Sequence, residues 1–244
     1  MKKGMYMALL VLGLLLFRSA GPERAVLADG SAQLAVERSV ALTFDDGPRR
    51  GTTDRLLDGL RERDARATFF LVGEQLDGNE DLVLRMVREG HQVGNHTWSH
   101  KGLLEGDETA FLTEIRQVET ALGELLGDGH YWLRPPYGQI TAERMQQVET
   151  PLVKWSVDPR DWESRNADRV VEAVLEEVRP GSIILLHDIY PSSVEAALRL
   201  VDALEAQGYE FVTVEELLRA GGIRPRAGMM YRAAEGQIIS KGSQ

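Results

Sequence analysis

From residue 39 onward, short apolar segments alternate with amphipathic ones, and this alternation constrains the fold more than any other feature of the sequence. Several of the short segments, such as 40–44, 67–72 and 182–186, are almost entirely apolar, which is typical of parallel strands buried on both faces. The other segments expected to form strands are 91–93, 131–133, 152–157 and 210–214. The segments with helical spacing of apolar residues are 53–64, 80–89, 108–126, 141–148, 167–178, 194–207 and 215–219.

Strands that alternate with helices of this length predict an α/β fold with a parallel sheet and right-handed crossovers. Roughly seven or eight such units in ~200 residues favour a distorted, TIM-like (β/α) barrel of seven or eight strands. An open, doubly wound sheet is the alternative. Its dinucleotide-binding version is disfavoured because no glycine-rich phosphate loop follows the first strand.

Composition excludes several classes of function. The 244 residues carry a formal net charge of −10, which argues against nucleic acid or an anionic membrane surface as the main partner. The chain has no cysteine, so disulfides, thiolate metal sites and cysteine nucleophiles are excluded together. Any metal ion must therefore be bound by His, Asp or Glu.

The first 28 residues have the pattern of a signal peptide or an N-terminal membrane anchor. Lys2 and Lys3 precede an apolar run over 5–17, which is shorter than the ~20 residues of a membrane span. Cleavage before Asp29 would release a secreted protein, whereas an uncleaved run would anchor it at the outer face of the membrane. We therefore expect the protein to act outside the cytoplasm. The rest of the chain divides into a linker, one folded domain and a basic flexible tail, at 29–38, 39–220 and 221–244.

Charged, imidazole and aromatic side chains follow five of the expected strands. Function in a barrel of this kind lies at the carboxyl ends of the strands, and polar groups placed there are costly to bury unless they are paired. Their convergence predicts an active site at that end. The residues are Asp45 and Asp46, then Asn95, His96 and His100, then Arg134 and Tyr137, then Asp158, Asp161 and Trp162, and finally His187 and Asp188.

Two of these groups together predict a metal site. His96 and His100 are four residues apart, so one helical turn would place both rings on one face. Asp45 and Asp46 leave a strand as neighbours and would point to opposite sides, so one carboxylate can bind a metal while the other stays free. Two histidines and one carboxylate leave open positions for water and substrate. A pair of surface histidines beside an Asp-rich turn is the alternative.

Five motifs in order carry a family resemblance. They are TFDDG at 43–47, HTWSH at 96–100, RPPYG at 134–138, DPRDW at 158–162 and LLHD at 185–188. Over about 39–220 the chain resembles the polysaccharide deacetylases, the carbohydrate esterase family four that includes chitin and peptidoglycan deacetylases. The resemblance implies that 39–220 is a catalytic domain with a distorted (β/α) barrel. It also implies metal-dependent removal of N-acetyl groups from a glycan such as peptidoglycan N-acetylglucosamine or chitooligosaccharide, in the cell wall.

The resemblance also implies a role for each motif residue. Asp45 would be the catalytic base, oriented by Arg134. Asp46, His96 and His100 would bind a divalent ion, zinc in the first place, with cobalt or another divalent ion as the alternative.

The remaining motif residues would serve the substrate and the leaving group. The backbone N–H of Tyr137 would stabilise the oxyanion, and Asp161 would tune His187 as the general acid. The substrate site would be lined by Trp162, Leu185 and Pro135.

Three other functions are consistent with parts of this pattern. An acetylxylan-type esterase would share the fold and the motifs. A non-haem iron oxygenase also uses two histidines and one carboxylate, but it would leave Asp45 and His187 without a role. A non-catalytic glycan-binding module would be expected to have lost a catalytic residue, and none is lost here. Metal content discriminates a hydrolase from the last two: zinc favours the hydrolase, iron the oxygenase, and no metal the binding module.

Overall fold

The structure is a computed structural model that describes residues 38–104, 106–127 and 129–234. The predicted leader over 1–28 lies outside the described residues, as do all but the last residue of the predicted linker and the final ten residues of the chain. Within the described part, no helix is both long enough and apolar enough to cross a membrane.

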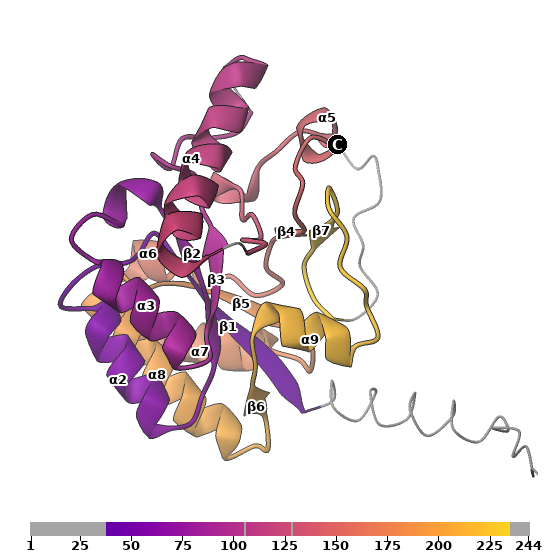
Figure 1. Cartoon of the computed structure of the whole chain (residues 1–244). Helices are drawn as coiled ribbons and strands as arrows, with labels where there is room; N and C mark the ends of the chain where they lie inside the picture. The colour runs from indigo at the N-terminus through magenta and orange to yellow at the C-terminus, as the bar shows by residue number, and fades with distance from the viewer. Residues whose placement is uncertain (1–37, 105, 128, 235–244) are drawn as a thin grey trace, which may run out of the picture.

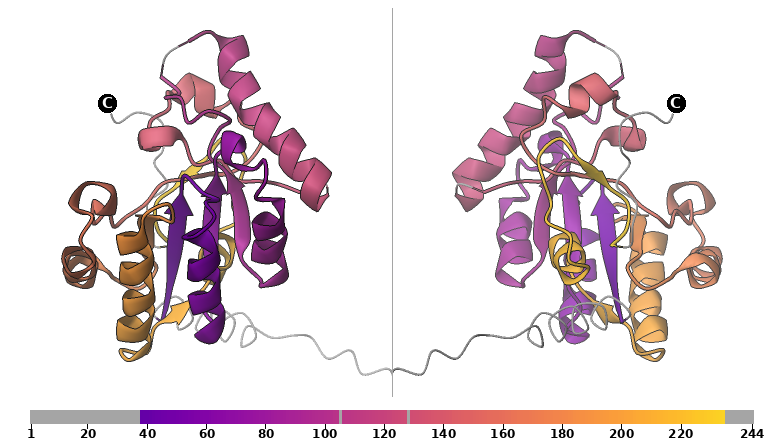
Figure 2. Two further views of the ribbon diagram at one scale, coloured as in Figure 1. Left: turned by 90° about the vertical axis from the view of Figure 1, so that its left-hand side faces the viewer. Right: turned by 90° about the vertical axis from the view of Figure 1, so that its right-hand side faces the viewer.

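A parallel sheet in the order β3-β2-β1-β5 forms the centre of the molecule, and β6 also pairs with β1 (Figure 1). The strands point toward the end of the molecule at which α4 lies, as both views of Figure 2 show. Their carboxyl ends therefore meet at that end. The five strands are β1 (Ser39–Asp45), β2 (Ala67–Leu71), β3 (Gln92–Asn95), β5 (Ile183–His187) and β6 (Glu210–Phe211).

Helices cover both faces of this sheet. Most of them contribute buried side chains to one large apolar cluster, namely α2 (Thr53–Glu62), α3 (Glu80–Arg88), α4 (Glu108–Leu126), α7 (Ala167–Glu177) and α8 (Pro191–Glu205). On the opposite face lies α9 (Val214–Ala220), which begins at a capping box formed by Thr213 and Glu216. Short helical segments are η1 (Gly73–Gln75), η2 (Pro136–Gly138), α5 (Ala142–Met145) and α6 (Asp161–Ser164).

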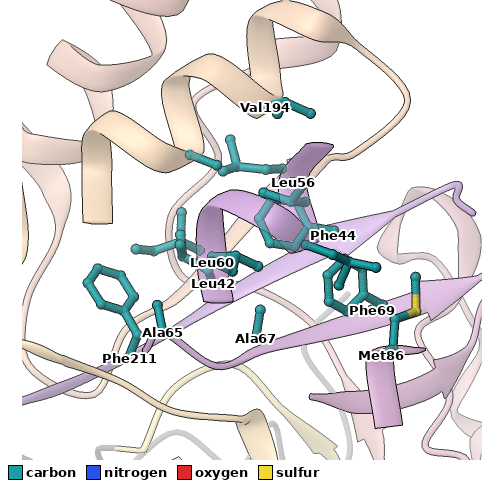
Figure 3. Close-up of a cluster of buried hydrophobic side chains, with 14 of the residues drawn as sticks. Leu42, Phe44, Leu56, Leu60, Ala65, Ala67, Phe69, Met86, Val194 and Phe211 are labelled. Carbon is teal, nitrogen blue, oxygen red and sulfur yellow. The ribbon is translucent and has the colours of Figure 1, made fainter. Parts of the chain in front are cut away.

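Side chains of β1 alternate between two environments. Val40, Leu42 and Phe44 face the helices and pack in the large cluster, part of which Figure 3 shows. Phe44 stacks on Phe69 of β2 with ring centroids 5.2 Å apart. Burial of each such side chain stabilises the fold by about 1.5–3 kcal/mol.

The other face of β1 turns toward the interior of the barrel. Ala41 packs there in a second cluster with Phe70 and Trp132, and α9 closes the cluster with Leu217 and Leu218. The same alternation turns the next two odd-numbered positions of the strand, 43 and 45, toward the interior. A polar site can therefore form above an apolar floor.

The predicted parallel α/β architecture is confirmed, and its distortion has a local cause. Beyond β3 the ladder continues only through single bridges, from Asn95 to Leu133 and from Leu133 to Leu152. The strand expected over 131–133 is thus a single bridge, and the strand expected over 152–157 shortens to β4 (Leu152–Val153). Prolines at 135, 136 and 151 flank these segments, and proline has no N–H to donate to a ladder. Regular strands do not close the barrel in the described part of the chain.

Part of the segment expected to be a basic flexible tail, 221–244, belongs to the fold. Met230 and Tyr231 form β7 (Met230–Tyr231), which pairs with β4 and is buried. The backbone N–H of Ala234 donates to the carbonyl of Gly181. The two-residue strand is too short to give a periodic pattern, which is why the sequence did not reveal it. The segment up to residue 234 is therefore part of the fold.

Candidate active site

Asp45 ends β1 and is held by a buried arginine. Arg134 Nη1 donates to Asp45 Oδ1 and to Thr43 Oγ1, both at 2.7 Å, and its Nη2 donates to the carbonyl of Lys154 at 3.2 Å. The guanidinium lies over the ring of Phe70, 4.1 Å from its centroid. A fully buried cation is tolerable only when it is paired. The pair therefore fixes the Asp45 carboxylate in one orientation.

Asp46 follows in a different conformation and faces the two histidines. Its backbone has a φ of 73°, in the left-handed region that residues other than glycine seldom adopt. Asp46 Oδ1 lies 3.6 Å from His96 Nε2 and 3.3 Å from His100 Nε2. This oxygen is buried and has no hydrogen-bond partner among the described residues. The three side chains offer ligand atoms within 4.8 Å of one another, as a metal site requires.

A hydrogen bond orients the His96 imidazole toward this point, and burial favours the neutral form of His100. His96 Nδ1 lies 2.6 Å from the carbonyl oxygen of Arg134, which only accepts, so the ring proton is assigned to Nδ1. The lone pair of Nε2 then faces Asp46, and such a carbonyl partner is typical of metal-binding histidines. Burial, and then the neighbouring His96, lower the pKa of His100. The neutral imidazole, the form that binds metals, is thereby favoured.

The helical turn expected over His96–His100 is wrong. The two rings do lie together, with centroids 4.9 Å apart, but they stand on a loop in which Thr97 and His100 have φ values of 68° and 55°. Asn95 Oδ1 accepts the Thr97 N–H, and the Glu114 carboxylate accepts both the N–H and the hydroxyl of Ser99. These side-chain acceptors fix the loop where a helix would have used backbone carbonyls.

Tyr137 lies beside this cluster in the RPPYG turn. Its φ is 60°, and its ring, 63% exposed, meets the ring of His100 edge-on at 5.0 Å. The next two N–H groups of the turn, those of Gly138 and Gln139, donate to the carbonyls of Pro135 and Pro136. The Tyr137 N–H belongs to the first turn of η2, where backbone donors have no partner within the helix.

His187 ends β5 and is paired with Asp161. Its Nδ1 lies 2.8 Å from Asp161 Oδ1, and its backbone N–H donates to Asp161 Oδ2 at 2.8 Å. The hydroxyl of Ser193, on α8, also donates to Asp161 Oδ2. Burial would lower the pKa of His187, but the hydrogen bond and charge of Asp161 outweigh it and raise that pKa to about 9. His187 therefore carries a proton at neutral pH.

The residues expected to line the substrate site differ in their exposure. Trp162 follows Asp161 in α6 and is 43% exposed. Leu185 is buried in β5 beside Thr43 of β1, and Pro135 is buried behind the Tyr137 turn. Asp158, another residue expected at this rim, accepts a hydrogen bond from the Arg160 N–H in a local turn.

Two polar residues of the site, Thr43 and Ser193, were given no role from the sequence. Thr43 accepts from Arg134 and donates to the carbonyl of Ile184, which links Arg134 to β5. A threonine in the middle of an apolar strand was the available signal. Ser193 gave no signal, because its contact with Asp161 crosses 32 residues.

Hollows adjoin the cluster on two sides. One, of about 500 Å³, is lined by Lys101, Leu104, Phe111, Tyr137 and Gln139 among others. The other, of about 520 Å³, is lined by Asp46, Arg49, Glu74, His100 and Ile189 among others. Each volume lies in the range of small-ligand sites.

Comparison with known proteins gives consistent results. A family model described as polysaccharide deacetylase matches residues 34–150. The peptidoglycan-N-acetylmuramic acid deacetylase PdaC of Bacillus subtilis (strain 168) is 38% identical over 74% of this chain and 39% of its own length. The present chain thus spans about two fifths of that relative.

Two solved structures match over nearly their whole chains. A T48 deacetylase determined with substrate is 41% identical, with a TM-score of 0.77, and the match covers 81% of this chain and 98% of that one. A family 4 acetyl xylan esterase from Clostridium thermocellum, in complex with a cobalt ion, is 33% identical, with a TM-score of 0.77. That match covers 82% of this chain and 100% of the esterase.

Proposed function

This chain belongs to the polysaccharide deacetylase family, and we propose that it hydrolyses N-acetyl groups from the amino sugars of peptidoglycan, outside the cytoplasm. One observation carries the proposal. The two carboxylates that leave β1 differ in their partners: Arg134 holds Asp45 Oδ1, whereas Asp46 Oδ1 faces both histidines. Asp45 Oδ2 lies 3.5 Å from His96 Nε2, and the protonated His187 stands with Asp161. A base, a metal-binding group and an acid are thereby present as distinct units.

We propose zinc as the ion held by Asp46, His96 and His100, because two imidazoles and one carboxylate suit it best. The buried, unpartnered oxygen of Asp46 fits a cation at this point. When bound, such an ion polarises the acetamide carbonyl and lowers the pKa of a water molecule from ~15.7 toward ~7. The cobalt in the related esterase makes cobalt the first alternative.

The chain's own residues then have the following roles. Asp45 accepts the proton of the attacking water at Oδ2, because Oδ1 is held by Arg134. The Tyr137 N–H donates to the carbonyl oxygen as negative charge develops there. His187 Nδ1 is held by Asp161, so Nε2 delivers the proton to the departing amine. The water oxygen bonds to the acetyl carbon, the C–N bond breaks, and acetate and a free amine leave.

The substrate groove follows from the same assignment. Trp162, Leu185 and Pro135 line the position of the acetyl group and its sugar. The two hollows beside Tyr137 and His100 accept neighbouring sugars of the glycan. A site open on two sides suits a polymer better than a single sugar.

Acetate release tests the proposal directly. The full-length protein, loaded with zinc, is incubated with peptidoglycan fragments and with chitooligosaccharides, with and without a chelator. We expect chelator-sensitive acetate release from peptidoglycan, with mass spectrometry assigning each lost acetyl to N-acetylglucosamine or N-acetylmuramic acid. Asp45→Asn is the matched inactive control. Release from chitooligosaccharides alone would replace peptidoglycan by a chitin-type substrate, and no release from either would contradict amide hydrolysis.

An acetylxylan-type esterase is the second candidate, favoured by the esterase of the same fold. Acetylxylan in the same assay discriminates the two: acetate from acetylxylan alone would identify the esterase. A protein that binds glycan and releases no acetate from any of these substrates would be a non-catalytic binding module.

A further inference from the structure

Asp188 is a buried carboxylate to which the proposed reaction gives no role. It follows His187 directly, and none of its surface is exposed. Its Oδ2 accepts a hydrogen bond from Thr53 Oγ1, at the start of α2. Its Oδ1 has no hydrogen-bond partner among the described residues. Burial raises the pKa of Asp188 to about 7, so a charged carboxylate is unfavourable here.

The carboxylate of Asp188 packs against the backbone next to Asp46. A Cβ atom added to Gly47 would lie only 2.4 Å from Asp188 Oδ1 and 2.5 Å from Oδ2. Real Cβ atoms do not come so close to an oxygen, so the contact exists because residue 47 is glycine. The carbonyl of Gly47 accepts the Val72 N–H at 3.0 Å, which fastens the same residue to the end of β2.

Thr53 links Asp188 to the other end of this turn. While its hydroxyl donates to Asp188, it accepts the backbone N–H of Arg49 at 2.8 Å. The turn over 46–49 is thus held from three elements: β2 through Val72, α2 through Thr53, and the end of β5 through Asp188.

The conformation of Asp46 needs such support. A non-glycine residue at positive φ persists only where its surroundings over-determine it. At its φ of 73°, Asp46 directs Oδ1 toward His96 and His100. Relaxation of the turn would move this oxygen away from the two imidazoles.

We propose that Asp188 is a positioning residue for the metal site: together with Thr53 it fixes the 46–49 turn so that Asp46 meets the two histidines. The inference rests on the proposed function, because it assumes that Asp46, His96 and His100 bind the ion. The residue next to the proposed acid thereby sets the geometry of the proposed metal ligand on another strand.

The test measures zinc affinity in the full-length protein, by competition with a chromogenic chelator. Asp188→Ala and Thr53→Val should each weaken zinc binding ~10–100-fold, the usual range for residues that orient a metal ligand. Asp188→Asn keeps the size of the side chain and an acceptor oxygen for Thr53, and Thr53→Ser keeps the hydroxyl. Both conservative variants should keep a zinc Kd within ~3-fold of wild type. This change is far smaller than the loss of affinity expected for Asp188→Ala and Thr53→Val.

Two comparisons separate positioning from a general structural role. Ser193→Ala deletes an equally buried hydroxyl at the acid, and it should leave the zinc Kd unchanged. The double variant Asp188→Ala/Thr53→Val should be no weaker than the worse single variant, because both act through one turn. If Asp188→Ala does not fold, the contrast between Thr53→Val and Thr53→Ser decides.

The outcomes are distinct. If Asp188→Ala and Thr53→Val are folded and bind zinc as tightly as wild type, the positioning role is overturned while the proposed function stays intact. A wild-type protein that binds no zinc would overturn the proposed metal site, and this inference with it. Neither result depends on finding the right glycan.

Discussion

The two halves of the site are built by different means. The metal half, which we define as Asp46, His96 and His100, depends on backbone conformations: two of these three residues have positive φ. The acid half, defined as His187 and Asp161, depends on side-chain hydrogen bonds. His187 lies in a regular strand, and Asp161 accepts three hydrogen bonds.

The two halves therefore differ in what controls them: backbone conformation controls the metal ligands, and a hydrogen-bonded charge controls the pKa of His187. In the metal half, the backbone decides whether the three ligand atoms meet, so changes there should act as all-or-none effects. In the acid half, one charge sets the pKa of one imidazole, so changes there should give graded shifts.

The largest effect is expected for His96→Ala. The variant loses one of three ligands and the hydrogen bond to the Arg134 carbonyl. We expect loss of the bound metal and a ~10³-fold or greater fall in kcat/KM, because the ion supplies several kcal/mol of stabilisation to the transition state. Metal analysis and acetate release check this. A variant that keeps its metal would show that the metal half does not depend on all three residues.

Asp45→Asn should be nearly as damaging to turnover while leaving the metal in place. The amide oxygen can still accept from Arg134, but it cannot take a proton from water. We expect a ~10²–10⁴-fold lower kcat, the usual contribution of a general base, with a wild-type zinc Kd. Substantial residual turnover would assign the base elsewhere.

Asp161→Asn should give the graded effect of the acid half. Asp161 raises the pKa of His187 to about 9 against the lowering effect of burial. The proposed acid must be protonated, so activity is present below that pKa and is lost as the pH rises through it. The neutral amide lowers the pKa, and the alkaline limb of the kcat profile should move to lower pH, with zinc affinity unchanged. An unmoved limb would remove His187 from the role of acid.

Tyr137→Gly should have the smallest effect. The proposed oxyanion donor is the backbone N–H, which glycine keeps, and glycine adopts the φ of 60° without strain. We expect less than a ~10-fold change in kcat, and an unfolding free energy about 1 kcal/mol higher for Tyr137→Gly than for Tyr137→Ala. Kinetics and denaturant unfolding measure the two. A ~100-fold fall in kcat for the glycine variant would instead require the phenol ring for catalysis.

The sequence predicted which side chains lie together at the strand ends better than it predicted the local structures that carry them. Apolar strands ending in Asp45 and His187 were visible because burial of whole strands leaves a continuous apolar run. The helix expected for His96–His100 was wrong, because side chains hold the loop: Asn95 accepts the Thr97 N–H, and Glu114, from another element, accepts the Ser99 N–H.

Contacts between distant segments account for what the sequence did not reveal. The carboxylate of Asp188 meets Thr53 across 135 residues, and β7 pairs with β4 from the segment expected to be a tail. Neither contact leaves a periodic or compositional trace. The predicted leader and the end of the tail stay predictions, since they lie outside the described residues.

The alternation of β1 has a consequence for how this protein can be altered. Its even positions, Val40, Leu42 and Phe44, pack in the large apolar cluster, whereas Thr43 and Asp45 bind Arg134 in the candidate site. A shift of one residue in register would exchange the two sets at once, so the strand cannot slip without losing both. Substitutions that raise thermal stability can therefore be sought at the even positions of β1, and substitutions that change turnover at the odd positions. The two sets of substitutions should have little effect on each other.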